Sequence, residues 1–358
     1  MATMGSSILP IRGRGASVNP ANRFERLSYE PEREPSEDGK EDASAPATVL
    51  FKDTSHSIIA YNDSPDVGFD ASVNPYRGCE HGCVYCYARP SHEYLGFSSG
   101  LDFESKIMVK EDAPELLRRE LASPRWKPQV LALSGVTDPY QPVERRLELT
   151  RRCLEVLAEF RNPVVIVTKN QLVTRDADLL GELARHRAAA VFVSVTSLDS
   201  DLVRRMEPRA STPERRLAAI SALSEKGIPV GVMVAPVIPA LNDHEIPAIL
   251  EAAVGAGARY SGYVLVRLPF AVKELFEKWL EHHFPDKKEK VLNRVRAVRG
   301  GKLNDPNFET RMRGEGIFAE QIENLFRTAC KRRGILGRRP DLSISGFRRL
   351  DARQLSFF

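Results

Sequence analysis

Short apolar runs alternate with longer amphipathic stretches between about residue 68 and residue 270 of the 358-residue chain. The apolar runs have the length and β-branched content of buried strands, and the stretches between them repeat apolar positions with a helical period. The predicted strands cover residues 69–74, 129–134, 164–168, 190–196, 230–237 and 260–267. The predicted helices cover residues 113–122, 144–160, 176–187, 213–226 and 244–253.

Six strands that are each followed by a helix predict one parallel sheet with right-handed crossover connections. We therefore expect an α/β fold in which six units, open rather than closed, make a partial (β/α)6 barrel of the TIM type. In barrels of this kind the chemistry takes place at the carboxyl ends of the strands. The barrel is expected to span residues 48–270.

The segments on either side of this barrel have different patterns. Residues 1–47 lack hydrophobic periodicity and carry clusters of Pro, Glu and Ser, which predicts an arm that does not fold alone. Its basic, Gly-rich stretch from Arg12 to Pro20 leaves open an arm that orders over the active site or on nucleic acid. Helical patterns at 272–282, 287–298 and 317–332 predict a helical extension over residues 271–345, followed by a tail at 346–358.

Three of the five cysteines, Cys79, Cys83 and Cys86, lie in one short run after the first predicted strand. Their spacing suits three corners of a cubane iron–sulfur cluster and leaves one iron without a protein thiolate. Structural zinc is the alternative, with His81 or His92 as the fourth ligand. Disulfides are disfavoured because the number of cysteines is odd and no signal-peptide pattern opens the sequence.

The residues between the cysteines carry a resemblance. The run reads Cys-x3-Cys-x2-Cys with an aromatic residue, Tyr85, directly before the third cysteine. This pattern resembles the signature of the radical S-adenosylmethionine (SAM) superfamily. The resemblance implies a [4Fe-4S] cluster on the three thiolates, SAM bound to the fourth iron, and Tyr85 near the adenine. It also implies a reductant such as flavodoxin or ferredoxin, and cleavage of SAM to a 5′-deoxyadenosyl radical.

Polar residues follow the second, third and fourth predicted strands. Thr137 and Asp138 suit an ammonium group, and Lys169 suits a carboxylate. Ser194 and Thr196 offer hydroxyl groups suited to a ribose. Because the carboxyl ends of parallel strands meet at one edge, these side chains are expected to face the cysteine run and to hold SAM.

A narrower resemblance, to the spore photoproduct lyase branch of the radical SAM proteins, runs from about residue 60 to residue 270. The residues that carry it are Thr137-Asp138, Val167-Thr168-Lys169, Ser194, and Glu207-Pro208-Arg209 with Arg215-Arg216-Leu217. The resemblance implies SAM contacts from Tyr85, Tyr87, Thr137, Asp138, Lys169 and Ser194. Thr196 is the alternative for the ribose hydroxyls.

The chain departs from this branch at one position. True lyases carry a cysteine directly before the Ser/Thr-Asp pair, and this cysteine returns a hydrogen atom to the repaired substrate radical. Here Gly135 and Val136 precede Thr137. Photoproduct lyase activity itself is therefore disfavoured, and Tyr76 and Tyr140 are the alternative hydrogen donors.

Composition and charge narrow the setting. Hydrophobic residues make up 42% of the chain, and no apolar run approaches the roughly 18 residues of a membrane span, which predicts a cytoplasmic protein without membrane contact. The net charge is +4, but residues 286–358 carry 18 Lys and Arg against 9 Asp and Glu. Such a region is compatible with a phosphate-rich partner such as a nucleic acid and equally with a solvated surface.

The last five residues, Gln354, Leu355, Ser356, Phe357 and Phe358, resemble the bacterial sliding-clamp-binding peptide. Two phenylalanines at an Arg-rich end are costly to expose, so a clamp or the protein's own core is expected to cover them. Together with the cysteine run, the tail favours a radical SAM enzyme that repairs or modifies DNA. The same chemistry on RNA, a nucleotide or a protein is one alternative. A non-catalytic DNA-binding protein with a metal cluster is another.

Overall fold

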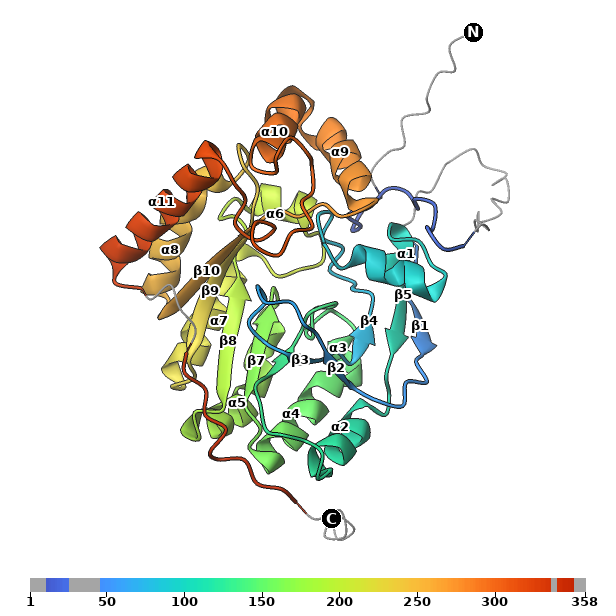
Figure 1. The fold of residues 1–358 in the computed structure, drawn as a ribbon, viewed down its shortest axis with the longest axis vertical. Helices are drawn as coiled ribbons and strands as arrows, with labels where there is room; N and C mark the ends of the chain where they lie inside the picture. Colours follow the sequence, from blue (N-terminus) through green and yellow to red (C-terminus); the bar gives the residue numbers. More distant parts are fainter. Residues whose placement is uncertain (1–10, 26–45, 336–339, 351–358) are drawn as a thin grey trace.

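A seven-stranded sheet forms the centre of the protein. The computed structural model describes residues 11–25, 46–335 and 340–350. The strands lie in the order β10-β9-β8-β7-β6-β3-β2, and all neighbours from β3 to β10 are parallel (Figure 1). The six parallel strands are β3 (Ala71–Val73), β6 (Leu131–Leu133), β7 (Val164–Thr168), β8 (Ala189–Ser194), β9 (Val230–Val237) and β10 (Tyr260–Leu265). The predicted partial barrel of six parallel strands is confirmed.

The sequence did not predict the seventh strand. This strand, β2 (Ile59–Tyr61), pairs antiparallel with β3 and forms one edge of the sheet, while β10 forms the other edge. β2 has only three residues, and two of them are exposed, so no apolar run marks it. The inner strand β8 shows the opposite pattern, because all six of its residues are buried.

Helices connect the parallel strands and cover the outside of the sheet (Figure 1). They are α2 (Ala113–Ala122), α3 (Glu144–Leu147), α4 (Leu149–Phe160), α5 (Ala177–Arg185), α6 (Ser200–Met206), α7 (Pro213–Glu225) and α8 (Ile246–Gly255). The single helix expected over 144–160 is two helices, because Glu148 has a φ of 51° and breaks the chain direction. The buried carboxylate of Glu144 accepts a hydrogen bond from the Thr150 backbone N–H at 3.0 Å and so caps the first turn of α4.

A second sheet that the sequence did not predict lies beside the barrel. It contains β1 (Val49–Lys52), β5 (Lys106–Val109) and β4 (Tyr76–Arg77), in the order β1-β5-β4. The 3₁₀ helix η1 (Arg89–Leu95) and the short helix α1 (Leu101–Ser105) lie between β4 and β5 in the chain. The cysteine run at residues 79–86 therefore begins two residues after β4 rather than directly after the first barrel strand.

The predicted C-terminal helices are present and pack on the barrel. They are α9 (Val272–His283), α10 (Pro285–Ala297) and α11 (Ile317–Arg333). On α9, Trp279 donates its indole N–H to the carbonyl of Arg205 at 3.0 Å. On α11, the ring of Phe326 lies 4.7 Å from that of Tyr263 on β10.

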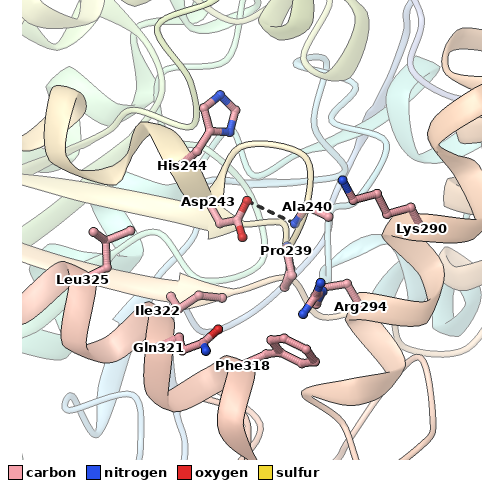
Figure 2. A pocket seen from close by; sticks show the side chains of 10 residues that line it. All are labelled: Pro239, Ala240, Asp243, His244, Lys290, Arg294, Phe318, Gln321, Ile322 and Leu325. Carbon is pink, nitrogen blue, oxygen red and sulfur yellow. Dashed lines mark hydrogen bonds between the residues drawn. The ribbon is translucent and has the colours of Figure 1, made fainter.

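A hollow of about 400 Å³ lies between the extension and the loop that follows β9 (Figure 2). Its walls come from residues 239–244, α10 and α11, and two cations, Lys290 and Arg294, stand on one side. Arg294 stacks on Phe318, with its guanidinium carbon 3.4 Å from the ring centroid. None of the strand-end residues predicted to bind SAM lines this hollow.

The final described segment returns to the amino ends of the strands. The Arg348 N–H bonds to the carbonyl of Phe160, and Arg349 donates to the carbonyl of Trp126 at 2.8 Å. The predicted clamp-binding residues 354–358 lie outside the described residues. Among the helices that the structure describes, we find none that is long and apolar enough to cross a membrane.

Candidate active site

The three cysteines form one buried loop at the carboxyl ends of the strands. Cys79 and Cys83 are each 7% exposed, Cys86 is half-buried, and all three are free thiols. The Cys79 N–H bonds to the carbonyl of Phe103 at 2.9 Å, and the Val84 N–H bonds to the carbonyl of Met206 at 3.0 Å. Backbone hydrogen bonds thus fix both ends of the loop.

A fully buried arginine, Arg89, fixes the conformation of this loop through hydrogen bonds to backbone carbonyls. Arg89 donates to the carbonyls of Cys83 at 2.9 Å and Gly100 at 2.9 Å, and also to that of Gly82. Its guanidinium pairs with the buried carboxylate of Glu104. Because a buried charge is tolerated only when it is paired and hydrogen-bonded, Arg89 and Glu104 together specify one loop conformation.

Part of the N-terminal arm lies against the same loop. The carboxylate of Glu104 accepts hydrogen bonds from the backbone N–H groups of Gly15 at 3.0 Å and Ala16 at 2.8 Å. A Cβ atom on Gly15 would lie 1.7 Å from the carbonyl oxygen of Gly82, so the arm approaches as only glycine can. Residues 11–25 therefore differ from the expectation for residues 1–47, because they have a fixed course on the cysteine loop and lack only helix and strand.

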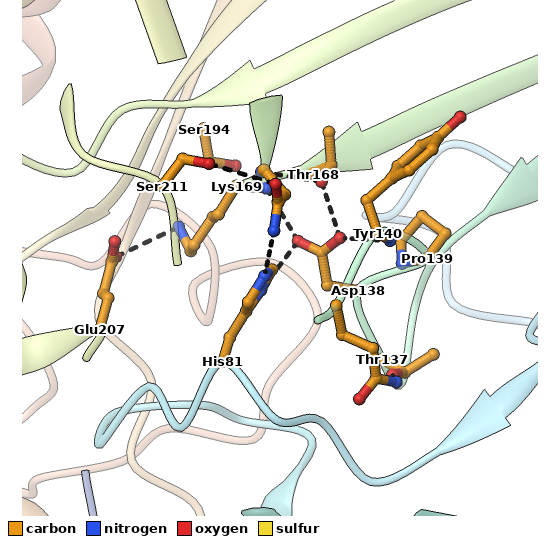
Figure 3. Close-up of polar contacts among 12 residues, drawn as sticks. His81, Thr137, Asp138, Pro139, Tyr140, Thr168, Lys169, Ser194, Glu207 and Ser211 are labelled. Carbon is orange, nitrogen blue, oxygen red and sulfur yellow. Dashed lines mark hydrogen bonds and ion pairs between the residues drawn. The ribbon is translucent and has the colours of Figure 1, made fainter. Parts of the chain in front are cut away.

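The histidines proposed as zinc ligands have other surroundings. His81 lies beside Asp138, whose Oδ2 is 3.3 Å from its Nδ1 (Figure 3). On its other side the Asn170 Nδ2 is 3.1 Å from the His81 Nε2. His92 is fully buried between Phe97 and Phe103, and burial lowers its pKa to about 4. Within the described residues, no three His, Cys, Asp or Glu side chains converge closely enough to hold a single metal ion.

These observations disfavour the zinc alternative and are compatible with a cluster. In a cubane each thiolate binds a different iron, so its three sulfurs need not converge on one point. Without a metal, burial raises the pKa of Cys83 and raises that of Cys86 to about 11. A bound iron ion reverses this effect, because a coordinating thiol loses its proton.

Asp138 is the centre of the hydrogen bonds at the strand ends. Its carboxylate accepts from the Thr168 hydroxyl at 2.7 Å, the Lys169 N–H at 2.8 Å and the Tyr140 N–H at 2.9 Å, in addition to His81 (Figure 3). Both oxygens are therefore already engaged by the protein. The expectation that Asp138 directly holds an ammonium group is not supported by this geometry, which makes Asp138 a link between β6, β7 and the cysteine loop.

Thr137 has a similar linking position. Its hydroxyl donates to the carbonyl of Gly78 at 2.7 Å and accepts from the side chain of Gln141 at 3.0 Å. Gln141 in turn accepts from the Glu80 N–H at 2.9 Å. Thr137 thus holds the residues that flank Cys79, and its hydroxyl is occupied.

Lys169 stands beside a buried glutamate that the sequence analysis left without a role. Its ammonium group donates to the carbonyl of Ala235 at 2.8 Å and lies 3.5 Å from Glu207 (Figure 3). Thr196 donates to Glu207 at 2.6 Å, and Tyr85 also donates to it. The sequence signal for Glu207 was its place in the Glu-Pro-Arg stretch of the narrower resemblance.

The charge on this group is balanced by Arg216. The guanidinium pairs with Glu207 and also donates to the carbonyls of Ser194 at 3.1 Å and Ser211 at 2.8 Å. Burial lowers the pKa of Lys169 to about 8, and the nearby Arg216 adds to the effect. Tyr85, Lys169, Ser194 and Thr196 thus lie around one glutamate and one arginine.

The tyrosines divide into two classes. Tyr76 and Tyr140 are fully buried, Tyr76 donates to Glu144, and the Tyr140 ring points away from His81 and Lys169 (Figure 3). A substrate cannot reach either phenol in this conformation, which argues against both as hydrogen donors. Tyr87 differs, because it is 49% exposed and donates its hydroxyl to the carbonyl of Gly135 at 2.7 Å.

Comparisons with known proteins agree with this arrangement. The sequence profile of the Radical SAM superfamily matches residues 73–253. An uncharacterised protein of Mycobacterium tuberculosis strain H37Rv is 36% identical over 269 residues, which cover 73% of this chain and 78% of that protein. The Radical SAM Nα-GlyT isomerase of Pseudomonas phage M6 is 25% identical over 175 residues, which cover 48% of this chain and 34% of the isomerase.

Solved structures show the same fold. Spore photoproduct lyase complexed with dinucleoside spore photoproduct is similar with a TM-score of 0.56. Its sequence identity to this chain is 15%, and the match covers 80% of this chain and 79% of the lyase. At this identity the match speaks for the fold.

Proposed function

Because the chain belongs to the radical SAM superfamily, we propose that its cysteine loop and strand ends form a SAM-cleaving centre that acts on DNA. The cofactors of the superfamily are a [4Fe-4S] cluster and SAM, and the chain is an enzyme of this kind. When bound, the reduced cluster supplies one electron that cleaves a C–S bond of SAM and yields a 5′-deoxyadenosyl radical. The buried cysteine loop beside the Lys169–Glu207 group is the single observation that carries the proposal.

Cys79, Cys83 and Cys86 would hold the cluster. Their thiols are free and largely shielded from water, and the Arg89–Glu104 pair and the arm hold the surrounding backbone. A loop that is fixed before the metal binds loses little conformational entropy on binding. Shielding from water also protects a cluster, since hydrophobic surroundings control solvent access.

Lys169 would pair with the carboxylate of SAM, and Ser194 and Thr196 would contact its ribose. Glu207 keeps Lys169 and Thr196 in position, and Tyr85 is bound to the same carboxylate. Thr137 and Asp138 would support SAM binding indirectly, because their polar atoms already form hydrogen bonds to the cysteine loop and to the end of β7. Tyr87 completes the set at the exposed side of the loop.

DNA is the substrate that we propose. The basic surplus of residues 286–358 supports it. Spore photoproduct lyase, which has the same fold, was solved in complex with dinucleoside spore photoproduct. Val136 stands at the position before Thr137 and is 37% exposed, so an aliphatic side chain replaces the hydrogen-donating thiol of the lyases. We therefore propose a repair- or modification-type reaction other than photoproduct cleavage.

The test is anaerobic reconstitution of the full chain with iron and sulfide, followed by SAM and dithionite. We expect 5′-deoxyadenosine from the native protein and from Cys330→Ala, which changes a cysteine on α11 that contacts Ser261, and none from Cys83→Ala. Absence of 5′-deoxyadenosine from the native protein would sink the enzyme proposal. Deuterium transfer into 5′-deoxyadenosine from labelled DNA, RNA, nucleotide or protein then identifies the substrate class.

Three further proposals concern the setting of the enzyme. A flavodoxin or ferredoxin would supply the electron, and the reaction would take place in the cytoplasm. The tail at residues 354–358 would dock on the sliding clamp and bring the enzyme to DNA. Deleting these five residues should abolish clamp binding and spare SAM cleavage, whereas unchanged clamp affinity would refute the docking proposal.

A further inference from the structure

We infer that Arg267, which lies against the ring of Tyr87, binds a DNA phosphate at the exposed side of the cysteine loop. This inference rests on the proposed function, since it names the group by which the DNA substrate would be held. Arg267 follows β10, and Tyr87 directly follows the third cysteine of the loop. The guanidinium carbon of Arg267 lies 5.1 Å from the centroid of the Tyr87 ring.

Arg267 forms no ion pair with any residue that the structure describes. Its Nη1 lies 3.8 Å from the sulfur of Met312. The nearest acidic influence is that of Asp66, whose carboxylate is bound to Arg311. The Nε of Arg267 is buried and has no hydrogen-bond partner in the part of the chain that the structure describes. Burial lowers the pKa of Arg267, and the nearby Arg311 adds to the effect. A half-buried guanidinium that lacks an anion is costly, and a bound anion removes that cost.

The surroundings fix this arginine in place. Arg299 is buried and donates to the carbonyls of Leu265 at 3.2 Å and Val266 at 2.8 Å, so it holds the end of β10. Tyr87 is held from the other side by its hydrogen bond to Gly135. Arg267 therefore sits on a rigid frame.

Next to Arg267, side-chain and backbone contacts connect the two edges of the open sheet. Asp66, in the loop between β2 and β3, pairs with Arg311 through two contacts of 2.6 Å. The segment of Arg311 is tied to the other edge of the sheet, because the Leu265 N–H bonds to the carbonyl of Met312 at 3.0 Å. The charge of Arg311 is thus neutralised by Asp66, whereas Arg267 has no ion-pair partner among the described residues. The uncompensated positive charge therefore lies where Arg311 connects the two edges of the sheet.

A phosphate fits this site better than a small neutral group. The planar guanidinium matches phosphate geometry, and the terminal Nη atoms of Arg267 are the donors that a phosphate would meet, because the Nε is buried. The Tyr87 ring lies against the guanidinium of Arg267 and favours its charged form. The basic surplus after residue 286 extends favourable charge for a longer polyanion.

The test measures binding of a short fluorescein-labelled DNA duplex to the anaerobically reconstituted full chain, over a range of salt concentrations. For Arg267→Gln, we expect the slope of log K against log salt to fall by about 0.9, the value for one phosphate contact. The plots of log K against log salt for the native protein and for Arg267→Gln should meet near about 1 M salt. A slope that is lower by about 0.9 then corresponds to roughly eightfold weaker DNA binding at about 0.1 M salt. Arg267→Lys should retain most of the slope, and Arg125→Gln, an exposed arginine before the amino end of β6, should match the native protein.

Each other outcome has a defined meaning. A native slope and affinity in Arg267→Gln would overturn the inference, although the proposed function would stand. Weaker SAM binding by that variant would assign Arg267 to the cofactor carboxylate and also overturn it. Arg267-dependent binding of an RNA duplex or a labelled acidic peptide in preference to DNA would reject the DNA phosphate. A native protein that binds no DNA would instead remove the DNA part of the proposed function.

Discussion

The cysteine loop and the end of β10 face the same site, but charged side chains are paired in the loop and one is left unpaired at the end of β10. In the loop, Arg89 is paired with Glu104, and Glu80 with Arg209 at 3.1 Å. At the end of β10, Arg267 has no such partner among the described residues. A region whose charges are all satisfied internally is suited to hold a cofactor in one geometry. A region with an unsatisfied charge is suited to receive a substrate.

We call the cysteine loop and the neighbouring strand ends, where the charges are paired, the paired region. Removal of the Glu207 carboxylate should have the largest effect there, because it would leave Arg216 and Lys169 without their anion. Glu207→Ala should lower the free energy of unfolding by about 3–5 kcal/mol, because Arg216 is left charged and buried without a partner. Urea denaturation of the purified protein measures this loss. Glu251→Ala breaks the exposed pair with Arg333 and should cost less than about 1 kcal/mol. Equal effects of the two substitutions would contradict a special role for the buried pair.

Lys169→Met removes the one cation of the paired region that we assign to SAM. We expect the dissociation constant for SAM to rise roughly tenfold to a hundredfold, since a hydrogen bond to a charged group contributes about 1.5–3 kcal/mol. Equilibrium dialysis with the reconstituted protein measures it. Lys226→Met, at an exposed position before β9, is the control and should bind SAM as the native protein does. A native dissociation constant in Lys169→Met would reassign the carboxylate of SAM to another residue.

Gly15→Ala tests whether the arm belongs to the cysteine region. The added Cβ would overlap the carbonyl of Gly82, so the arm should detach or shift at a cost of about 1–3 kcal/mol. We expect faster loss of cluster absorbance in air because the loop loses a cover. Gly181→Ala lies on α5 with open space around its Cβ and should be neutral or slightly stabilising. Unchanged cluster lifetime in Gly15→Ala would mean that the arm does not protect the loop.

A change of pH should alter SAM binding through Lys169, by less than the Lys169→Met substitution does. Lys169 has a lowered pKa of about 8, so it is protonated below that pH and loses its charge above it. The SAM affinity of the native protein should therefore fall as the pH rises, by about tenfold between pH 8 and pH 9 at most. Lys169→Met should lack this component of the pH profile. Parallel profiles for the two proteins would show that another group titrates.

The two regions also differ in how far the sequence predicted them. The cysteine spacing and the polar strand ends are local patterns, and the structure brings together Lys169, Ser194, Thr196 and Tyr85 as the parallel sheet requires. The engaged state of Asp138 was not predictable, because its four partners come from three separate segments of the chain. The same holds for Glu207 and Arg216, whose burial depends on tertiary packing.

Other features were missed for different physical reasons. The β1-β5-β4 sheet is made of strands of two to four residues, which are too short for a period of two to be visible. The docking of the arm rests on Gly15 and backbone N–H groups that bind Glu104, a contact across 89 residues without an apolar signal. The unpaired state of Arg267 is a negative property that becomes visible only when every neighbour is in place.

The central claim is that the paired region holds a cluster to which SAM binds directly. Electron paramagnetic resonance of the dithionite-reduced, reconstituted protein, recorded with and without SAM, tests this claim most directly. We predict a reduced-cluster signal whose g values shift when SAM is added to the native protein, with no cluster signal in Cys83→Ala. A native spectrum that is the same with and without SAM would contradict the account.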